Sequence, residues 1–71
     1  MVEYEIHTKK FKFGDNAFEN AIRSDFGFEI KKIRTDGDNL IYEVERQRNL
    51  TVTDMYKIEY IDGVSFITIA D

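Results

Sequence analysis

His7 is the only histidine of the chain and therefore the first residue to examine for chemistry. A histidine can activate a nucleophile as a general base, but the nucleophile has to lie beside it. No motif marks such a nucleophile, and His7 shares the polar face of a predicted strand with Glu5. We interpret it as a surface histidine, and we predict that the protein is not an enzyme.

Four glutamates at alternating positions of two predicted strands form a second candidate site: Glu3, Glu5, Glu43 and Glu45. If the two strands are neighbours, the four carboxylates lie together, where they could bind Mg²⁺ or act as an acid and base pair. Solvated strand faces commonly carry such residues opposite lysines, here Lys31 or Lys32. We favour this second interpretation, in which the glutamates keep one face of the sheet in water.

Dedicated metal sites are not predicted elsewhere. The chain has one histidine and no cysteine, so zinc would lack its usual ligands. The segment Asp36-Gly37-Asp38-Asn39 begins like a calcium-binding loop, but a glycine is needed at the sixth position and a glutamate at the twelfth. The chain has Ile41 and Gln47 there. We therefore expect a simple turn at 36–39, and no metal or cofactor.

Basic and aromatic residues are interleaved in one short segment, composed of Lys9, Lys10, Phe11, Lys12 and Phe13. Single-strand nucleic-acid binders often place stacking aromatic residues beside lysines in this way. The alternative is that both phenylalanines face the core while the lysines protect a strand edge. The net charge of −4 favours the alternative.

The elements that position these residues begin with a strand and a helix. Residues 2–7 alternate between apolar and polar side chains, which is typical of a half-buried strand. Residues 16–26 predict a helix, because Asn16 can cap its start and Gly27 suits its end. An apolar stripe at helical spacing between these caps includes Phe18 and Ile22. About ten residues are too few for a stable isolated helix, so it has to pack on a sheet.

The remaining residues are predicted to be strands. Residues 28–33 form one, and the change of parity at Lys31-Lys32 predicts a bulge in it. After the turn at 36–39, residues 40–45 alternate again, and a further strand is expected to start at Leu50.

The sequence also predicts a final β-hairpin, with Asp62-Gly63 as a two-residue type I′ turn between alternating runs. In that register Ile58 lies opposite Ile67 on an apolar face. On the other face, Ile61 lies opposite Val64, and Glu59 lies opposite Phe66. We expect five residues to form the centre of the core: Phe18, Ile22, Tyr42, Ile58 and Ile67.

One helix covers only part of one sheet face, so the second face of this hairpin is expected to expose an apolar group. Its members are Met55, Ile61, Val64 and Phe66. Exposed apolar groups with a charged rim are typical of contacts with a partner protein or with a second copy. The alternative is that the sheet curls and buries both faces.

Composition limits the classes of protein that fit. The 71 residues suffice for a single domain, 1–71, and a hydrophobic content of 42% argues against disorder. The longest apolar run, Leu40-Ile41-Tyr42, is far short of a membrane span. The acidic, alternating N-terminus does not resemble a signal peptide. We expect a soluble, cytoplasmic protein.

These patterns together predict an α+β domain in which one short helix packs on a mostly antiparallel sheet of four to five strands, in the order β-α-β-β-β-β. For function they favour a small, non-catalytic protein-binding or regulatory module, whose partner is another protein or a second copy. A composition poor in Gly, Ala and Pro and rich in Ile, Lys and Phe is typical of AT-rich genes, so an inhibitor from a phage or other mobile element is one form of this hypothesis. The alternative function is nucleic-acid binding through residues 9–13.

Overall fold

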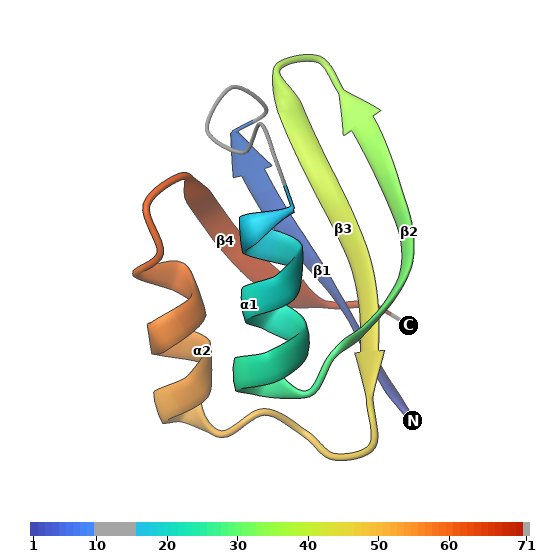
Figure 1. Ribbon diagram of the computed structural model, residues 1–71, viewed down its shortest axis with the longest axis vertical. Helices are drawn as coiled ribbons and strands as arrows, with labels where there is room; N and C mark the ends of the chain where they lie inside the picture. The colour runs from blue at the N-terminus through green and yellow to red at the C-terminus, as the bar shows by residue number, and fades with distance from the viewer. Residues whose placement is uncertain (10–15, 71) are drawn as a thin grey trace.

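The computed structural model of the protein describes residues 1–9 and 16–70. Its elements are β1 (Val2–Lys9), α1 (Ala17–Phe26), β2 (Glu29–Asp36), β3 (Asn39–Arg46), α2 (Val52–Glu59) and β4 (Val64–Ile69) (Figure 1). The predicted α+β class and the antiparallel sheet are confirmed. The predicted single helix and strand order are wrong, because the observed order is β-α-β-β-α-β.

The four strands form one antiparallel sheet in the order β2-β3-β1-β4. The strands β3 and β1 are therefore central, and β2 and β4 are the two edges. Tyr4, Ile6 and Thr8 of β1 are buried, whereas the odd-numbered residues between them are only partly covered. Tyr4 and Ile6 belong to the same core cluster as Phe18 and Ile22 of α1, so the even-numbered side chains of β1 face the helices.

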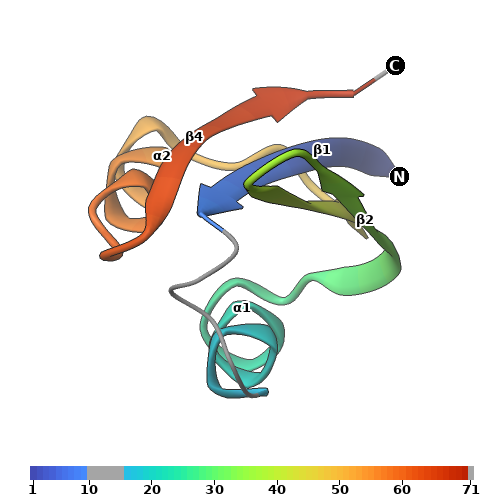
Figure 2. The same ribbon diagram turned by 90° about the horizontal axis from the view of Figure 1, so that it is seen from above.

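We call the opposite side of the sheet the open face. By strand register its residues are Glu3, Glu5 and His7 of β1, Ile41, Glu43 and Glu45 of β3, Glu29, Lys32 and Arg34 of β2, and Phe66 and Thr68 of β4. Lys31, in the bulge of β2, also reaches this face, where it contacts Glu3 and Glu45. Seen from above, α1 lies well to one side of the sheet and α2 lies next to β4 (Figure 2).

Helix α1 has the predicted limits. Gly27 follows it in the left-handed conformation, with φ at 67°, and its N–H donates to the carbonyl of Arg23. Asn16 occupies the N-cap position, but its side chain makes no capping hydrogen bond. The predicted cap at Asn16 is therefore not formed. The helix is held mainly by Phe18 and Ile22, which are 4% and 0% exposed.

The hairpin of β2 and β3 also follows the sequence pattern. Gly37 has φ at 62° in the two-residue turn that joins the strands, and a positive φ at the first central residue is what a type II′ turn requires. The pairing shifts by one residue between Ile30 and Lys32. The predicted bulge at Lys31-Lys32 is thus confirmed.

The predicted final hairpin is wrong, because residues 52–59 form helix α2. Thr51 caps this helix: its hydroxyl accepts a hydrogen bond of 3.1 Å from the N–H of Asp54. Met55, Ile58 and Ile61 follow at spacings of three, and all three pack on or in the core. The alternation of Tyr56, Ile58 and Tyr60 also fits a strand, which is why a strand was predicted. Tyrosine can be either buried or exposed, so its position did not decide between strand and helix.

The turn at Asp62-Gly63 is nevertheless present. The N–H of Val64 donates to the carbonyl of Ile61 at 3.0 Å, and Gly63 has φ at 98°. A type I′ turn would need a positive φ at Asp62 as well, but only glycines have positive φ in the described residues. The turn therefore joins α2 to β4 instead of joining two strands.

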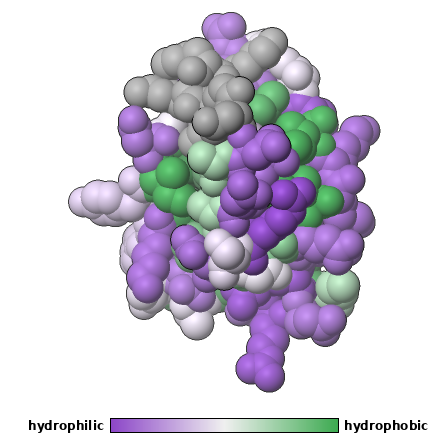
Figure 3. Space-filling model, in the orientation of Figure 1, coloured by the Kyte–Doolittle hydropathy of each residue, from purple (hydrophilic) through white to green (hydrophobic). Residues whose placement is uncertain are grey.

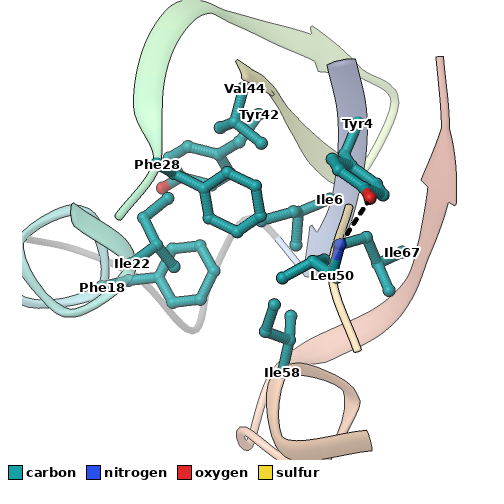
Figure 4. Close-up of a cluster of buried hydrophobic side chains, with 10 residues drawn as sticks. All are labelled: Tyr4, Ile6, Phe18, Ile22, Phe28, Tyr42, Val44, Leu50, Ile58 and Ile67. Atoms are coloured by element: carbon teal, nitrogen blue, oxygen red, sulfur yellow. Dashed lines mark hydrogen bonds between the residues drawn. The ribbon is translucent and has the colours of Figure 1, made fainter. Parts of the chain in front are cut away.

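Both helices and the sheet share one hydrophobic core, drawn in Figure 4. All five residues predicted for its centre are buried. Aromatic side chains meet edge to face within it: the ring centroids of Phe18 and Tyr42 lie 5.0 Å apart, and those of Tyr4 and Phe28 5.8 Å apart. The Tyr4 hydroxyl accepts a hydrogen bond of 2.9 Å from the N–H of Leu50 (Figure 4). This bond fixes the connection between β3 and α2 to the central strand.

The substitution Tyr4→Phe tests that bond. It keeps the ring but leaves the buried N–H of Leu50 without an acceptor, so we expect the free energy of unfolding to fall by about 1–3 kcal/mol. Urea unfolding followed by circular dichroism measures the change. Tyr56→Phe is the matched control, because Tyr56 is 66% exposed and the same change there should cost little.

The cap of α2 gives a second test. Thr51→Ala removes the acceptor for the Asp54 N–H and should destabilise the protein by about 0.5–2 kcal/mol. Thr53→Ala changes an exposed threonine of the same helix and serves as its control. Equal effects of the two substitutions would contradict the capping role of Thr51.

Candidate functional site

The four candidate carboxylates do lie together. Glu3 is opposite Glu45, and Glu5 is opposite Glu43, in the pairing of β1 with β3. Lys31 lies between the first two, with hydrogen bonding to Glu3 and a distance of 3.9 Å to Glu45. Arg34 joins the second two: its Nε lies 3.0 Å from Glu43 and its Nη2 lies 3.3 Å from Glu5. Each of the four glutamates thus contacts a cation from β2, and the predicted contact of this face with a lysine is confirmed for Lys31.

This pairing changes the ionisation of the first couple. The hydrogen bond and charge of Lys31 lower the pKa of Glu3, and the same contact with Glu3 raises the pKa of Lys31. A carboxylate that stays ionised is a poor general acid. Within residues 1–9 and 16–70, no group of His, Asp and Glu side chains has the arrangement needed to hold a metal ion. The open face therefore carries a lattice of ion pairs between its glutamates and the cations of β2.

His7 belongs to the same lattice. Its Nε2 lies 3.1 Å from Glu5, and its ring stacks on Phe66 with centroids 4.3 Å apart and planes 15° from parallel. Beneath them, Ile41 is 1% exposed although it lies on the open face, because His7 and Arg34 flank it in the register. The expected contact of His7 with Glu5 is confirmed. Its side chain covers an apolar residue.

The predicted apolar interface is not assembled as a single exposed group. Met55, Ile61 and Val64 are partly buried and pack against the core cluster, while Phe66 lies on the open face and is 46% exposed. The register that placed them together was that of the hairpin, and α2 replaces its first strand. Of the four residues, Phe66 alone keeps a largely exposed side chain.

Of the basic-aromatic segment, Lys9 is exposed at the end of β1. Lys10, Phe11, Lys12 and Phe13 lie outside the described residues.

A different exposed group was missed by the sequence reasoning. Val52 and Tyr56 of α2 and its C-cap residue Tyr60 are 68%, 66% and 91% exposed, and they follow each other at intervals of four. We call these three residues the α2 stripe. The signal that could have found it was Thr51 with Asp54 three positions later, which is a typical helix start.

The two edges of the sheet differ in chemistry. The edge strand β2 carries Glu29, Lys31, Lys32, Arg34 and Asp36, and it is interrupted by a bulge. The other edge, β4, reads Val-Ser-Phe-Ile-Thr-Ile and has no charged residue, proline or glycine. Charges and bulges are the usual protection of an edge against pairing with other strands. The strand β4 lacks such charges, and its one irregularity lies at its start, opposite His7 and Thr8.

The backbone of β4 presents unpaired groups on its outer side. Ala70 donates from its N–H to the carbonyl of Glu3, so Ala70 faces β1, and the alternation of an antiparallel ladder directs Thr68 and Phe66 the same way. Ile67 and Ile69 therefore direct their N–H and C=O groups away from β1. The sheet order has no strand on that side among the described residues.

The face shown in Figure 3 is largely hydrophilic, with hydrophobic side chains gathered on both sides of α1. The described part of the chain contains no detected pocket, and none of its helices is long and apolar enough to cross a membrane. Comparison with protein-family models, curated proteins and solved structures finds no match to this chain.

The ion-pair lattice leads to a test. The lowered pKa of Glu3 means that its ionised form stabilises the fold above the pKa of the unfolded chain, and that this contribution is lost as the pH falls through the folded-state pKa. Lys31→Met should raise the pKa of Glu3 toward its ordinary value of 4.5. A carboxyl-detected NMR titration measures the shift, and Lys32→Met is the control. A Glu3 pKa that does not respond to Lys31→Met would refute the pairing.

Proposed function

We propose that the protein is a small, non-catalytic protein-binding module, and that it binds by adding an extended strand of its partner to β4. The observation that supports this most directly is the uncharged outer edge of β4. Strand addition at an open edge is a recurring mode of peptide recognition, in which main-chain hydrogen bonds give affinity and side-chain contacts give selectivity.

The geometry of β4 supplies both the main-chain hydrogen bonds and the side-chain contacts. Ile67 and Ile69 each offer one N–H and one C=O on the outer side of β4. Phe66 and Ile69 stand on opposite faces of the sheet at this edge, 46% and 58% exposed, so each can contact alternate side chains of an added strand. An extended partner segment with apolar residues at alternating positions fits this surface best.

The charges of the open face argue for protein rather than nucleic acid as the partner. Lys31 and Arg34 are paired with glutamates from the two central strands and are not directed at a phosphate backbone. A net charge of −4 also opposes binding to a polyanion. A module of this kind acts by occupying a surface of its partner, as a regulator or an inhibitor does. An inhibitor from a phage or other mobile element is one form of this function.

The substitution Ile69→Pro tests the site. It removes one outward N–H of β4, while the ladder to β1 is preserved because the Ile69 amide does not face that strand. Random linear peptides are displayed, selected on the wild-type protein and counter-selected on Ile69→Pro. We expect the selected peptides to alternate β-branched or aromatic residues with others, and to lose at least about tenfold in affinity on Ile69→Pro.

The other edge supplies the matched control. Thr35 lies on the edge strand β2, opposite Leu40. Asp36 and Asn39 close the two-residue hairpin as a hydrogen-bonded pair, so Thr35 and Leu40 form the next, non-hydrogen-bonded pair and the N–H of Thr35 faces outward. Thr35→Pro should leave peptide affinity unchanged. Amide chemical-shift changes should centre on Ile67 and Ile69. Chemical-shift changes confined to β2 or to α1 would refute β4 as the binding site. Equal losses of peptide affinity for Ile69→Pro and Thr35→Pro would refute it as well.

A further inference from the structure

We infer that the strand added to β4 belongs to a second copy of this chain, so that two four-stranded sheets join into one continuous antiparallel sheet. The inference rests on the proposed function and names the partner. It follows from the self-complementarity of β4 and from the position of the α2 stripe.

The N–H and C=O groups that point away from β1 set the register in which β4 can pair with the β4 of a second copy. A two-fold axis at Thr68 places Ile67 of one copy opposite Ile69 of the other, and the reverse. Because Ile67 and Ile69 direct their N–H and C=O groups outward, each of these pairs can exchange two hydrogen bonds. Thr68 then faces its own equivalent, and Phe66 faces Ala70 of the second copy. Every unpaired outward group of these two residues obtains a partner.

Because of the two-fold symmetry, self-pairing of β4 requires that the strand has no charged residue near the axis. A residue near the axis lies close to its own equivalent, so any charge there would meet a like charge. No residue of β4 is charged. The same operation on β2 would bring Lys31 and Lys32 toward their equivalents, in a strand that also contains a bulge. The chemistry of the two edges therefore permits self-pairing at β4 and opposes it at β2.

The α2 stripe belongs to the helix that lies next to β4. Helix α2 contacts β4 and lies at the end of the sheet away from β2 (Figures 1 and 2). Ile58 of α2 points into the core (Figure 4), so helical geometry turns Val52, Tyr56 and Tyr60 outward. A strand paired with β4 passes beside this helix, and the second copy brings its own α2 with it.

The exposed apolar area is of the right order for a dimer. An aromatic side chain buries about 150–250 Å² when covered, so the α2 stripe with Phe66 and Ile69 offers on the order of 500 Å² per copy. The backbone and neighbours of the paired strands add to this area. Stable interfaces bury about 800 Å² per partner.

Sedimentation equilibrium from micromolar to millimolar protein tests the inference. We expect a monomer–dimer equilibrium that Ile69→Pro weakens at least about tenfold, because symmetry removes two hydrogen bonds at once. Thr35→Pro should leave it unchanged. Half-filtered NOEs between labelled and unlabelled copies should connect Thr68 with its own equivalent.

Charged substitutions of Thr68, the residue at the two-fold axis, test the symmetry without introducing a proline. Thr68→Lys should dissociate the dimer, because two lysines would meet at the axis, while within each copy the introduced lysine faces Glu5. Thr68→Glu should dissociate it as well. Mixing the two variants should restore a heterodimer, whereas Thr68→Val should stay dimeric.

The outcomes separate this inference from the proposed function. If the protein stays monomeric at millimolar concentration but binds selected peptides at β4, the inference that the partner is a second copy is overturned and the proposal of strand addition stands. A dimer that is insensitive to Ile69→Pro and to Thr68→Lys overturns the assignment of β4 as its interface. Failure of peptides and of self-association together overturns both proposals.

Discussion

The alternation of side chains along β1 is the constraint on which the rest of the structure depends. Because β1 lies between β3 and β4, each of its residues serves one of two faces. Its even positions hold the core: Ile6 is fully buried, and the Tyr4 hydroxyl holds Leu50 and with it the approach to α2. Its odd positions carry the glutamates and the histidine of the open face. A shift of one residue would exchange the two sets and leave neither face viable.

The open face shows what holds the four candidate glutamates in place. Four carboxylates on two adjacent strands would repel one another if they were alone. Lys31 and Arg34 each reach across to two of them, and the bulge in β2 between Ile30 and Lys32 sets which side chains of that strand lie on this face. His7 and Arg34 flank the buried Ile41 in the register, and Phe66 stacks on His7. Surface ion pairs contribute little singly, so the network gains its value mainly by fixing the register of the three strands.

The sequence alone predicted those parts of the fold whose signals are local and unopposed. Gly27, Gly37 and the parity change at 31–32 each mark one backbone feature, and each is confirmed. The segment 52–60 carries two compatible periods, since Ile58 fits a strand with Tyr56 and a helix with Met55 and Ile61. Packing decides between them: in the helix Ile58 is buried and Met55 and Ile61 contact the core, while the tyrosines reach water. The alternation alone does not make that choice, for which the helix start at Thr51 and Asp54 and the tertiary packing are needed.

The same error explains why the four apolar residues predicted to be exposed together are not found together on the surface. The sequence interpretation looked for side chains, and it found Phe66 but grouped it with three residues that pack on the core. The surface at β4 consists chiefly of backbone groups, whose availability depends on which strand ends the sheet. With α2 in place of a strand, β4 loses a neighbour and becomes an edge. The helix that the pattern concealed is therefore also the reason that an uncharged strand is left open to pair with another chain.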